Sequence, residues 1–184
     1  ALIPAKFLSD AAKSLAHNKE VSLSFANTNE GIVGVSGEDR QTTSRLLAAD
    51  FPKYQALLPN ESSSVAQIPT SVLIEAVKRV SLVLEREAPV KIHFTNSEAI
   101  ISGGGGSGEI AEAHEAIECS LNGDAITIAF NHQFLLDGLN AIDSSVAVIA
   151  MTQPHKPAII TGAKEVDGEA FEAFKYLLMP IRQP

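Results

Sequence analysis

The pattern of apolar and polar residues repeats three times along the chain, and each repeat opens with an apolar stripe of helical period. The first stripe consists of Phe7, Leu8, Ala11, Ala12 and Leu15. Equivalent stripes begin after Pro69 and after Asn131. Pro4 and Pro69 suit the first turn of a helix, where a missing backbone N–H costs nothing, and Asn131 suits the cap of the third helix. The sequence therefore predicts three amphipathic helices.

Three segments of β-strand character follow each predicted helix. Residues 21–25, for example, alternate apolar and polar side chains, as a half-buried strand does. The segments are 21–25, 31–35 and 42–47 in the first repeat, 90–94, 99–101 and 111–121 in the second, and 146–149, 158–160 and 171–178 in the third. A further strand precedes the second helix at 65–68 and the third helix at 125–130.

The repeating unit is thus β-α-β-β-β, which predicts an α+β fold with helices on one face of antiparallel sheets. The second and third helices are expected side by side, which makes 61–184 one domain of two modules. Residues 50–64 lack periodicity and carry Pro, Asn and a Ser run, so they are interpreted as a linker. The segment 1–60 is then half a domain plus the linker. Half a domain leaves apolar surface without a partner, and the chain opens on Ala1 rather than Met, so we expect a fragment of a longer protein.

Composition narrows the class of protein. The chain has 184 residues, 14 Lys+Arg against 22 Asp+Glu, and a formal net charge of -8. This balance is typical of a soluble globular protein and unlike a domain that grips nucleic acid with a broad basic face. No apolar run approaches the roughly 18 residues of a membrane span. A single cysteine, Cys119, excludes an internal disulfide framework and favours a reducing, cytoplasmic location.

Catalytic and metal-binding motifs are weak or incomplete. The glycine run 103–108 is not followed by the Lys-Ser/Thr of a phosphate-binding loop, so a hairpin tip is expected there. His114 begins a His-Glu-x-x sequence that ends in Glu118 rather than the second His of a zinc protease. Cys119 has no positive neighbour in sequence to lower its pKa, so an inert cysteine is expected. The sequence predicts no catalytic residue, no metal site and no cofactor.

Two apolar segments do not fit an ordinary loop or a frayed chain end. One is the predicted linker from Phe51 to Pro59, and the other is the C-terminal run from Tyr176 to Ile181. Pro180 cannot donate to a sheet, so the residues after Leu178 lie past the point where a strand should stop. From physics alone, packing and partner binding are equally good explanations of both segments.

Those residues carry a resemblance to a known family. The linker beginning Phe51-Pro52-Lys53-Tyr54, the helix start at Phe130-Asn131 and the closing run Tyr-Leu-Leu-Met-Pro-Ile-Arg over 176–182 together resemble the bacterial DNA polymerase III beta subunit, the replicative sliding clamp. The Met-Pro-apolar-Arg ending is a specific motif of that family, and the threefold repeat agrees with it. The resemblance spans the whole chain. It implies that 1–60 is the C-terminal half of the clamp's middle domain plus the interdomain linker, and that 61–184 is its C-terminal domain.

The resemblance implies the DNA clamp fold and a role as a processivity factor of DNA replication. Two protomers of the family join head to tail into a ring that encircles duplex DNA, with helices lining the hole and sheets forming the outer wall. The clamp is a non-catalytic subunit of the DNA polymerase III holoenzyme. It slides on the DNA and tethers DNA polymerase, the clamp loader and repair proteins, which insert short linear peptides into a hydrophobic pocket.

The resemblance also assigns roles to individual residues. Positions matching the peptide-binding pocket are Pro52, Leu57, Asn131, Phe134, His155, Pro157, Leu177, Leu178, Met179, Pro180, Ile181 and Arg182. The apolar linker and the apolar tail would then be two walls of one groove. Two positions depart from the family: a basic residue is common where Ala56 stands, and a Tyr where Phe134 stands. Part of the family pocket also comes from the first half of the middle domain, which this sequence does not include.

The remaining assignments concern DNA and ring closure. The DNA-facing candidates are Lys6, Lys13, Lys78 and Arg79, of which Lys6 matches a basic family position that faces the hole. Each could equally be a cation on a solvated helix face. The ring-interface candidates are Leu82 at the end of the second helix and the acidic pair Glu112 and Glu115. Because the family's N-terminal domain supplies the other side of each interface, we expect this chain alone not to close a ring.

Net charge is compatible with this interpretation, since a ring holds DNA by topology and needs positive charge only on its inner helices. Two alternatives remain. One is a small-molecule-binding or enzymatic α+β protein with its site in a cleft between modules. The other is an architectural protein whose apolar tail forms an oligomer.

Overall fold

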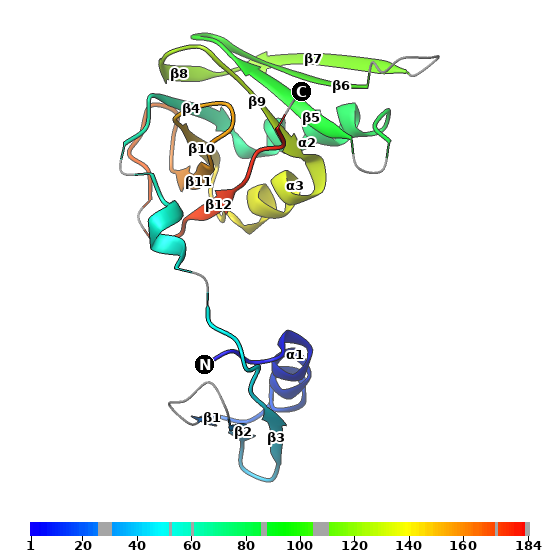
Figure 1. The fold of residues 1–184 in the computed structure, drawn as a ribbon, viewed down its shortest axis with the longest axis vertical. Coiled ribbons are helices and arrows are strands. Elements are labelled where there is room, and N and C mark those ends of the chain that lie inside the picture. Colours follow the sequence, from blue (N-terminus) through cyan, green and yellow to red (C-terminus); the bar gives the residue numbers. More distant parts are fainter. Residues whose placement is uncertain are drawn as a thin grey trace. The chain divides into compact units, whose positions relative to one another are not determined.

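The computed structural model describes residues 1–25, 31–51, 53–59, 61–85, 88–104, 111–171 and 173–182. The chain forms two compact units, Ala1–Tyr54 and Gln55–Pro184 (Figure 1). The domain boundary expected from the sequence, after residue 60, stays a prediction. All three expected helices are present, and each begins directly after Pro4, Pro69 or Asn131.

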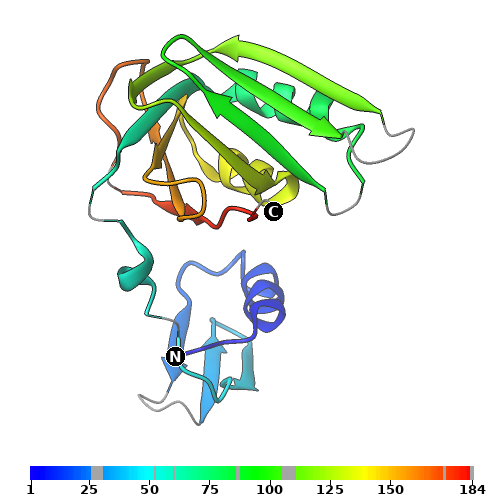
Figure 2. The same ribbon diagram turned by 45° about the horizontal axis from the view of Figure 1, so that its top comes forward.

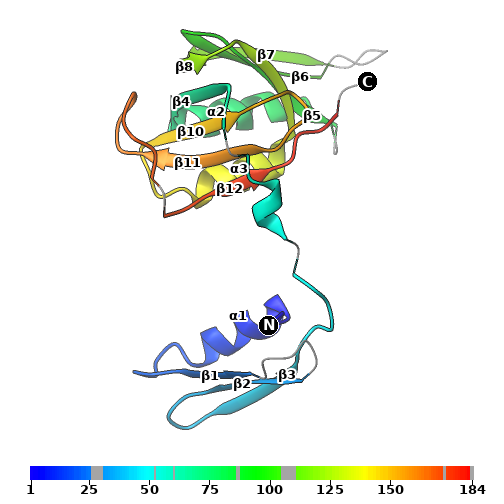
Figure 3. The ribbon, with the colours of Figure 1, turned by 60° about the vertical axis from the view of Figure 1, so that its left-hand side comes forward.

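The first unit is a helix on a three-stranded antiparallel sheet. The elements are α1 (Ala5–Ser14), β1 (Ser22–Phe25), β2 (Ile32–Ser36) and β3 (Gln41–Arg45), and the strand order is β1-β2-β3. Figure 3 shows α1 lying across one face of this sheet. Ala11, Leu15 and Val35 form a small core cluster with Phe7 packed against it, and Val33 and Leu46 are buried as well. Phe7, Ala11 and Leu15 recur every four residues, so they lie on one side of the helix.

Much apolar surface of the first unit stays exposed. Leu8, in the predicted helical stripe, is 42% exposed, and Leu23, Phe25 and Ile32 on the strands are 46%, 46% and 61% exposed. All four residues of β1 are exposed.

The second unit contains two antiparallel sheets. The five-stranded sheet has the order β12-β11-β10-β4-β8, and the four-stranded sheet has the order β7-β6-β5-β9. The strands of the first are β4 (Ser64–Pro69), β8 (Ser120–Gly123), β10 (Val146–Met151), β11 (Ala158–Ala163) and β12 (Tyr176–Leu178). The strands of the second are β5 (Pro89–Phe94), β6 (Glu98–Gly104), β7 (Glu112–Glu118) and β9 (Ile126–Asn131). A short 3-10 helix, η1 (Tyr54–Leu57), begins at the boundary between the two units.

Two helices, α2 (Thr70–Ser81) and α3 (His132–Ala141), lie side by side, and each contacts strands of both sheets (Figure 1). The prediction that they pair, with helices on one face of antiparallel sheets, is confirmed. Their inward side chains, among them Leu73, Leu135 and Leu139, are fully buried with Phe94 and Phe130 from the four-stranded sheet. Each such side chain contributes roughly 1.5–3 kcal/mol by leaving water.

One expected strand is in fact two. The segment 111–121 was predicted as a single strand, but β7 ends at Glu118 and β8 begins at Ser120, in the other sheet. Cys119 stands at the break, and its N–H bonds to the C=O of Ser97 at 3.1 Å. The chain therefore passes from the four-stranded to the five-stranded sheet here, a change that apolar alternation does not reveal because it continues through both strands.

The last predicted strand, 171–178, is much shorter than expected. Only Tyr176–Leu178 forms β12. Upstream, Phe171 donates to the C=O of Gly162 at 2.7 Å, next to an isolated bridge between Ala163 and Ala170. Among the described residues before β12, the chain meets β11 at this point, and the regular ladder begins where Tyr176 pairs with Ile160.

Gly138 allows β12 to approach α3 closely. A Cβ at this position would lie 2.5 Å from the ring of Tyr176, which is too close for any real contact. Glycine in a helix costs about 1 kcal/mol relative to alanine, so its presence here is explained by the aromatic ring rather than by the helix.

We predict that the effect of Gly138→Ala changes sign with the residue at position 176. In the wild-type background it should destabilise the protein by roughly 1–3 kcal/mol, because the new methyl group displaces the Tyr176 ring. In a Tyr176→Ala background it should stabilise the helix, since only the gain in helix propensity remains. Urea unfolding of the four proteins measures both effects. Destabilisation of equal size in both backgrounds would contradict this account.

Candidate functional site

The start of α3 presents an exposed aromatic side chain on a firmly capped helix turn. Asn131 is the last residue of β9 and the N-cap of α3, as the sequence predicts. Its Oδ1 accepts hydrogen bonds from the backbone N–H groups of Gln133 at 2.9 Å and Phe134 at 3.2 Å. Such a cap contributes typically about 1 kcal/mol. The Phe134 side chain is nevertheless 57% exposed, so the cap holds an apolar group at the surface.

Tyr176 joins the C-terminal tail to that helix turn. Its hydroxyl donates to the C=O of Phe134 at 3.0 Å, and its ring packs against Gly138. Burial, together with the negative charge of Asp137, raises the pKa of Tyr176, so the hydroxyl stays protonated and able to donate. The sequence assigned no role to Tyr176. The signal that could have identified it is the glycine inside a helix, which marks a close approach.

The C-terminal tail, residues 176–182, connects the two sheets of the second unit. Leu177 pairs with Ile159 of β11, and Leu178 is buried at 3% exposure. Past Pro180 the N–H of Ile181 donates to the C=O of Ala129 in β9 at 2.8 Å. Figure 2 shows this tail, in red, running beside α3. Met179, between the two anchor points, is 56% exposed. The tail is therefore packed, with one apolar side chain left at the surface.

The residues expected in one pocket come from η1, the start of α3, the loop before β11 and the tail. His155, Ile181 and Arg182 line a cavity of about 630 Å³ that includes none of Asn131, Phe134, Leu177, Leu178 or Met179. Pro157 is half-buried in the loop before β11, and Pro180 is half-buried in the tail. Leu57, in η1, is 49% exposed. Pro52 lies outside the described residues.

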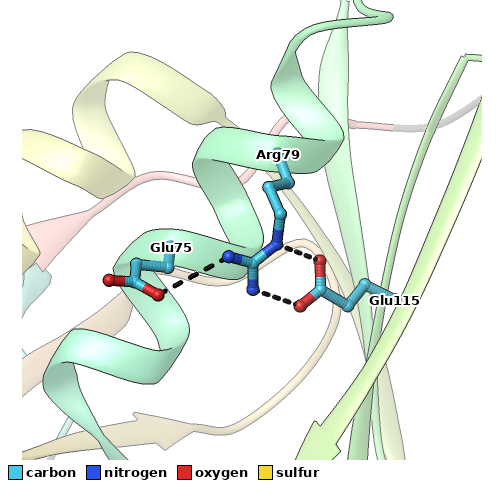
Figure 4. A network of polar contacts seen from close by, with 3 residues as sticks. All are labelled: Glu75, Arg79 and Glu115. Atoms are coloured by element: carbon cyan, nitrogen blue, oxygen red, sulfur yellow. Dashed lines mark hydrogen bonds and ion pairs between the residues drawn. The ribbon is translucent and has the colours of Figure 1, made fainter.

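The expected DNA-facing cations differ in their partners. Lys6 and Lys13 are exposed on α1, and Lys78 is exposed on α2. Arg79, by contrast, binds the carboxylate of Glu115 with two hydrogen bonds of 3.0 and 2.5 Å and contacts Glu75 at 3.5 Å (Figure 4). Its charge is therefore balanced within the second unit. The hydrogen bond from Arg79 lowers the pKa of Glu115, and the same bond raises the pKa of Arg79.

The expected ring-interface residues include an unusually exposed leucine. Leu82, directly after α2, is 84% exposed. The carboxylate of Glu112 contacts Nε2 of His114 at 3.2 Å on β7. Glu115, on the same strand, already faces Arg79 of α2. Two of the three candidates thus lie on one strand, and one of those two has an intramolecular partner.

The remaining chemical candidates are structural. His114 to Glu118 form part of β7, as their alternation indicates, rather than a metal-binding helix. Burial raises the pKa of the Cys119 thiol to about 11, in agreement with an inert cysteine. No group of three or more metal-ligating side chains occurs among the described residues. Most of the glycine run, from residue 105 on, lies outside them. None of the described helices is long and apolar enough to cross a membrane.

The sequence is similar to proteins of one known family. Residues 55–182 match the family model described as DNA polymerase III beta subunit, C-terminal domain. The chain is 50% identical over 184 residues to a beta sliding clamp of Streptomyces coelicolor, covering 99% of this chain and 48% of the relative. It is 43% identical over 182 residues to the beta sliding clamp homolog GriR of Streptomyces muensis, covering 98% of this chain and 48% of that protein.

The solved structures show the same fold. The crystal structure of a DNA polymerase sliding clamp from Bacillus subtilis superimposes with a TM-score of 0.83 at 26% identity, over 99% of this chain and 46% of that one. The chain therefore spans about half the length of the relatives it matches.

We predict that the ion pair of Arg79 and Glu115 makes a pH-dependent contribution to stability. Because the pKa of Glu115 is lowered in the folded protein, the contribution is present above the ordinary carboxyl pKa and is lost as pH falls through the folded-state value. Glu115→Gln should therefore lower the free energy of unfolding at about pH 7, and the difference from wild type should shrink toward about pH 3.

Urea unfolding across that pH range measures this difference. Glu112→Gln is the matched control, since its carboxylate lies on the same strand and is more exposed, so little effect is expected. A difference between wild type and Glu115→Gln that stays constant with pH would contradict the assignment.

Proposed function

Because the chain belongs to the DNA polymerase III beta subunit family, we propose that it is part of a replicative sliding clamp. In this proposal the full protein is a ring that encircles duplex DNA, slides on it and tethers DNA polymerase as a processivity factor. The observation that carries the proposal is the family match over 55–182, together with 50% identity to a named clamp along the whole chain.

The clamp catalyses no reaction in this proposal, and its effect is one of effective concentration. A polymerase tethered to a ring on the DNA returns to the template before it diffuses away, so dissociation no longer ends synthesis. Such a tether needs two properties: a topological hold on DNA and a partner-binding surface.

The partner-binding surface is proposed at the start of α3 and along the tail. Phe134 and Met179 are exposed apolar side chains on two segments that the Tyr176 hydroxyl joins. Capping by Asn131 and packing of Leu178 hold these segments in place, so little order has to be gained on binding. The rest of the proposed set comes from the linker, the loop before β11 and the tail, and consists of Pro52, Leu57, His155, Pro157, Leu177, Pro180, Ile181 and Arg182. Partner peptides would anchor by apolar side chains, with backbone hydrogen bonds setting their register.

The DNA-facing surface is proposed to use Lys6, Lys13 and Lys78. Each is exposed on a helix, which suits contacts to phosphates that are independent of base sequence. Arg79 is the weakest candidate, because Glu115 and Glu75 already neutralise it. A net charge of -8 supports a hold on DNA by enclosure rather than by affinity.

The ring interface is proposed at Leu82 and the acidic strand β7. Burial of the exposed Leu82 side chain against a second protomer would stabilise the complex by about 1.5–3 kcal/mol. This free energy supports an interface at Leu82. Among the described residues Glu112 contacts no Lys or Arg and only the imidazole of His114, so it is the better candidate for an ion pair with a second protomer.

We predict that a clamp-binding peptide of the Gln-Leu-x-Leu-Phe type binds a protein in which this chain is joined to the missing half of its middle domain. Met179→Ala should weaken binding by about 2 kcal/mol, roughly thirtyfold, as a truncated interface anchor does. Leu82→Ala removes an even more exposed apolar side chain, which lies outside the proposed surface, and should leave binding unchanged. Fluorescence anisotropy of the labelled peptide measures both. Failure of the folded protein to bind would overturn the proposed function.

We predict that the 184-residue chain alone does not close a ring. Light scattering should report the mass of a monomer, 19.5 kDa, because the other side of each interface belongs to a domain absent from this sequence. A stable closed dimer at micromolar concentration would show that the interface is assigned wrongly.

A further inference from the structure

A cavity of about 440 Å³ lies where the start of α2 meets the end of α3. Four hydroxyl groups and one amide line it together with three aliphatic side chains, and none of its described lining residues is charged. These residues are Thr70, Ser71, Ile74, Leu139, Asn140, Ile142, Ser144 and Ser145. A volume of this size is typical of sites that bind small molecules.

One of these hydroxyl groups is buried without a hydrogen-bond partner. Thr70 is 7% exposed, and its Oγ1 has no partner among the residues that the structure describes. A buried polar group costs free energy unless a donor or an acceptor reaches it. The backbone N–H of Thr70 differs, because it donates to the C=O of Ser145 at 2.9 Å. The Thr70 hydroxyl therefore remains as a donor for an occupant of the cavity that Thr70 lines.

The first turn of α2 adds backbone donors to the same cavity. The first N–H groups of an α-helix have no partner inside the helix. Pro69 occupies the N-cap position of α2, and no side chain caps the helix there. The N–H groups of Ser71 and Val72 therefore face out of the helix start, where the aligned peptide dipoles place partial positive charge. Such a helix start is suited to bind an anion.

The charged side chains on α2 and in the loop after α3 bear on this choice of ligand. Lys78 is exposed and lies seven residues after Ser71, about two turns along the same side of the helix. Glu75 contacts Arg79 at 3.5 Å, so its charge is balanced on the helix itself. Asp143, in the loop after α3, is exposed and opposes an anion. Its removal should therefore strengthen anion binding.

We propose that the cavity at the start of α2 binds a phosphate group. The hydroxyls of Thr70 and Ser71 and the N–H groups of Ser71 and Val72 donate to its oxygens, as hydroxyls and helix starts do in other phosphate sites. The phosphate belongs either to a nucleic-acid backbone or to a small phosphate compound. The cavity lies wholly in the second unit and contains none of the residues of the proposed peptide surface or ring interface. The proposal therefore does not depend on the clamp function.

The test follows the backbone amide resonances of the isotope-labelled 184-residue chain by NMR, in a buffer without phosphate. Potassium phosphate at neutral pH is compared with potassium chloride of equal ionic strength. The resonances of Ser71 and Val72 should shift and saturate with phosphate, and chloride should leave them in place. A short duplex DNA at equal phosphate concentration is the second arm. A shift of the same resonances by the duplex assigns the site to backbone phosphates, and a response to inorganic phosphate alone assigns it to a small phosphate compound.

Three variants test the assigned groups. Thr70→Val removes the buried hydroxyl and keeps the shape of the side chain, so affinity for phosphate should fall by about tenfold, the value of one charge-assisted hydrogen bond. Without phosphate this variant should be at least as stable as wild type, because the lost hydroxyl had no partner. Asp143→Asn should strengthen phosphate binding, since it removes a repelling carboxylate. Ser81→Ala is the control at the other end of α2 and should leave the affinity unchanged.

Several results would overturn the proposal. Equal shifts with phosphate and chloride, or no shift at all, would leave only an effect of ionic strength or a water-filled cavity. Saturating shifts that omit Ser71 and Val72 would place the phosphate elsewhere. An unchanged affinity in folded Thr70→Val would exclude its hydroxyl, and if that variant does not fold, unchanged affinities in both Ser71→Ala and Asp143→Asn overturn the site. None of these measurements involves the clamp-binding peptide, so failure here and failure of the proposed function are distinguishable.

Discussion

Burial of α2 and α3 against two antiparallel sheets is the interaction on which the second unit depends. Both helices contact strands of both sheets, and their inward leucines are fully buried. Because one core serves both modules, neither sheet could keep its helix covered alone. The first unit shows the contrast. Its single helix packs on a small core cluster of Ala11, Leu15 and Val35, and Leu8, Leu23 and Ile32 stay exposed.

The C-terminal tail depends on that core and in turn organises the surface. Leu178 is buried with the core residues, which fixes the chain on either side of it. Tyr176 then meets Gly138 and the C=O of Phe134, while Ile181 meets Ala129. One short segment thereby contributes both to the apolar surface at Phe134 and Met179 and to the cavity that Ile181 lines. Packing and binding, which the sequence left as alternatives for this tail, are both compatible with its structure.

The balance of positive and negative side chains differs from one region of the protein to another. An acidic chain presents Lys91, His155 and Arg182 around one cavity, while Arg79, on a helix expected to face DNA, is neutralised by Glu115. The type and place of an ionisable residue in sequence therefore do not reveal its effective charge. That charge depends on the partner, and the partner of Arg79 lies 36 residues away.

The sequence by itself determined the three helices, most strands and the resemblance to a clamp, because helical and strand periods and the starts at Pro4, Pro69 and Asn131 are local signals. Three features depend on tertiary structure alone. They are the point at Cys119 where the chain passes from one sheet to the other, the carboxylate that binds Arg79, and the close approach of Tyr176 that requires glycine at position 138. These outcomes depend on which distant segments meet, and apolar alternation is the same whichever sheet a strand joins.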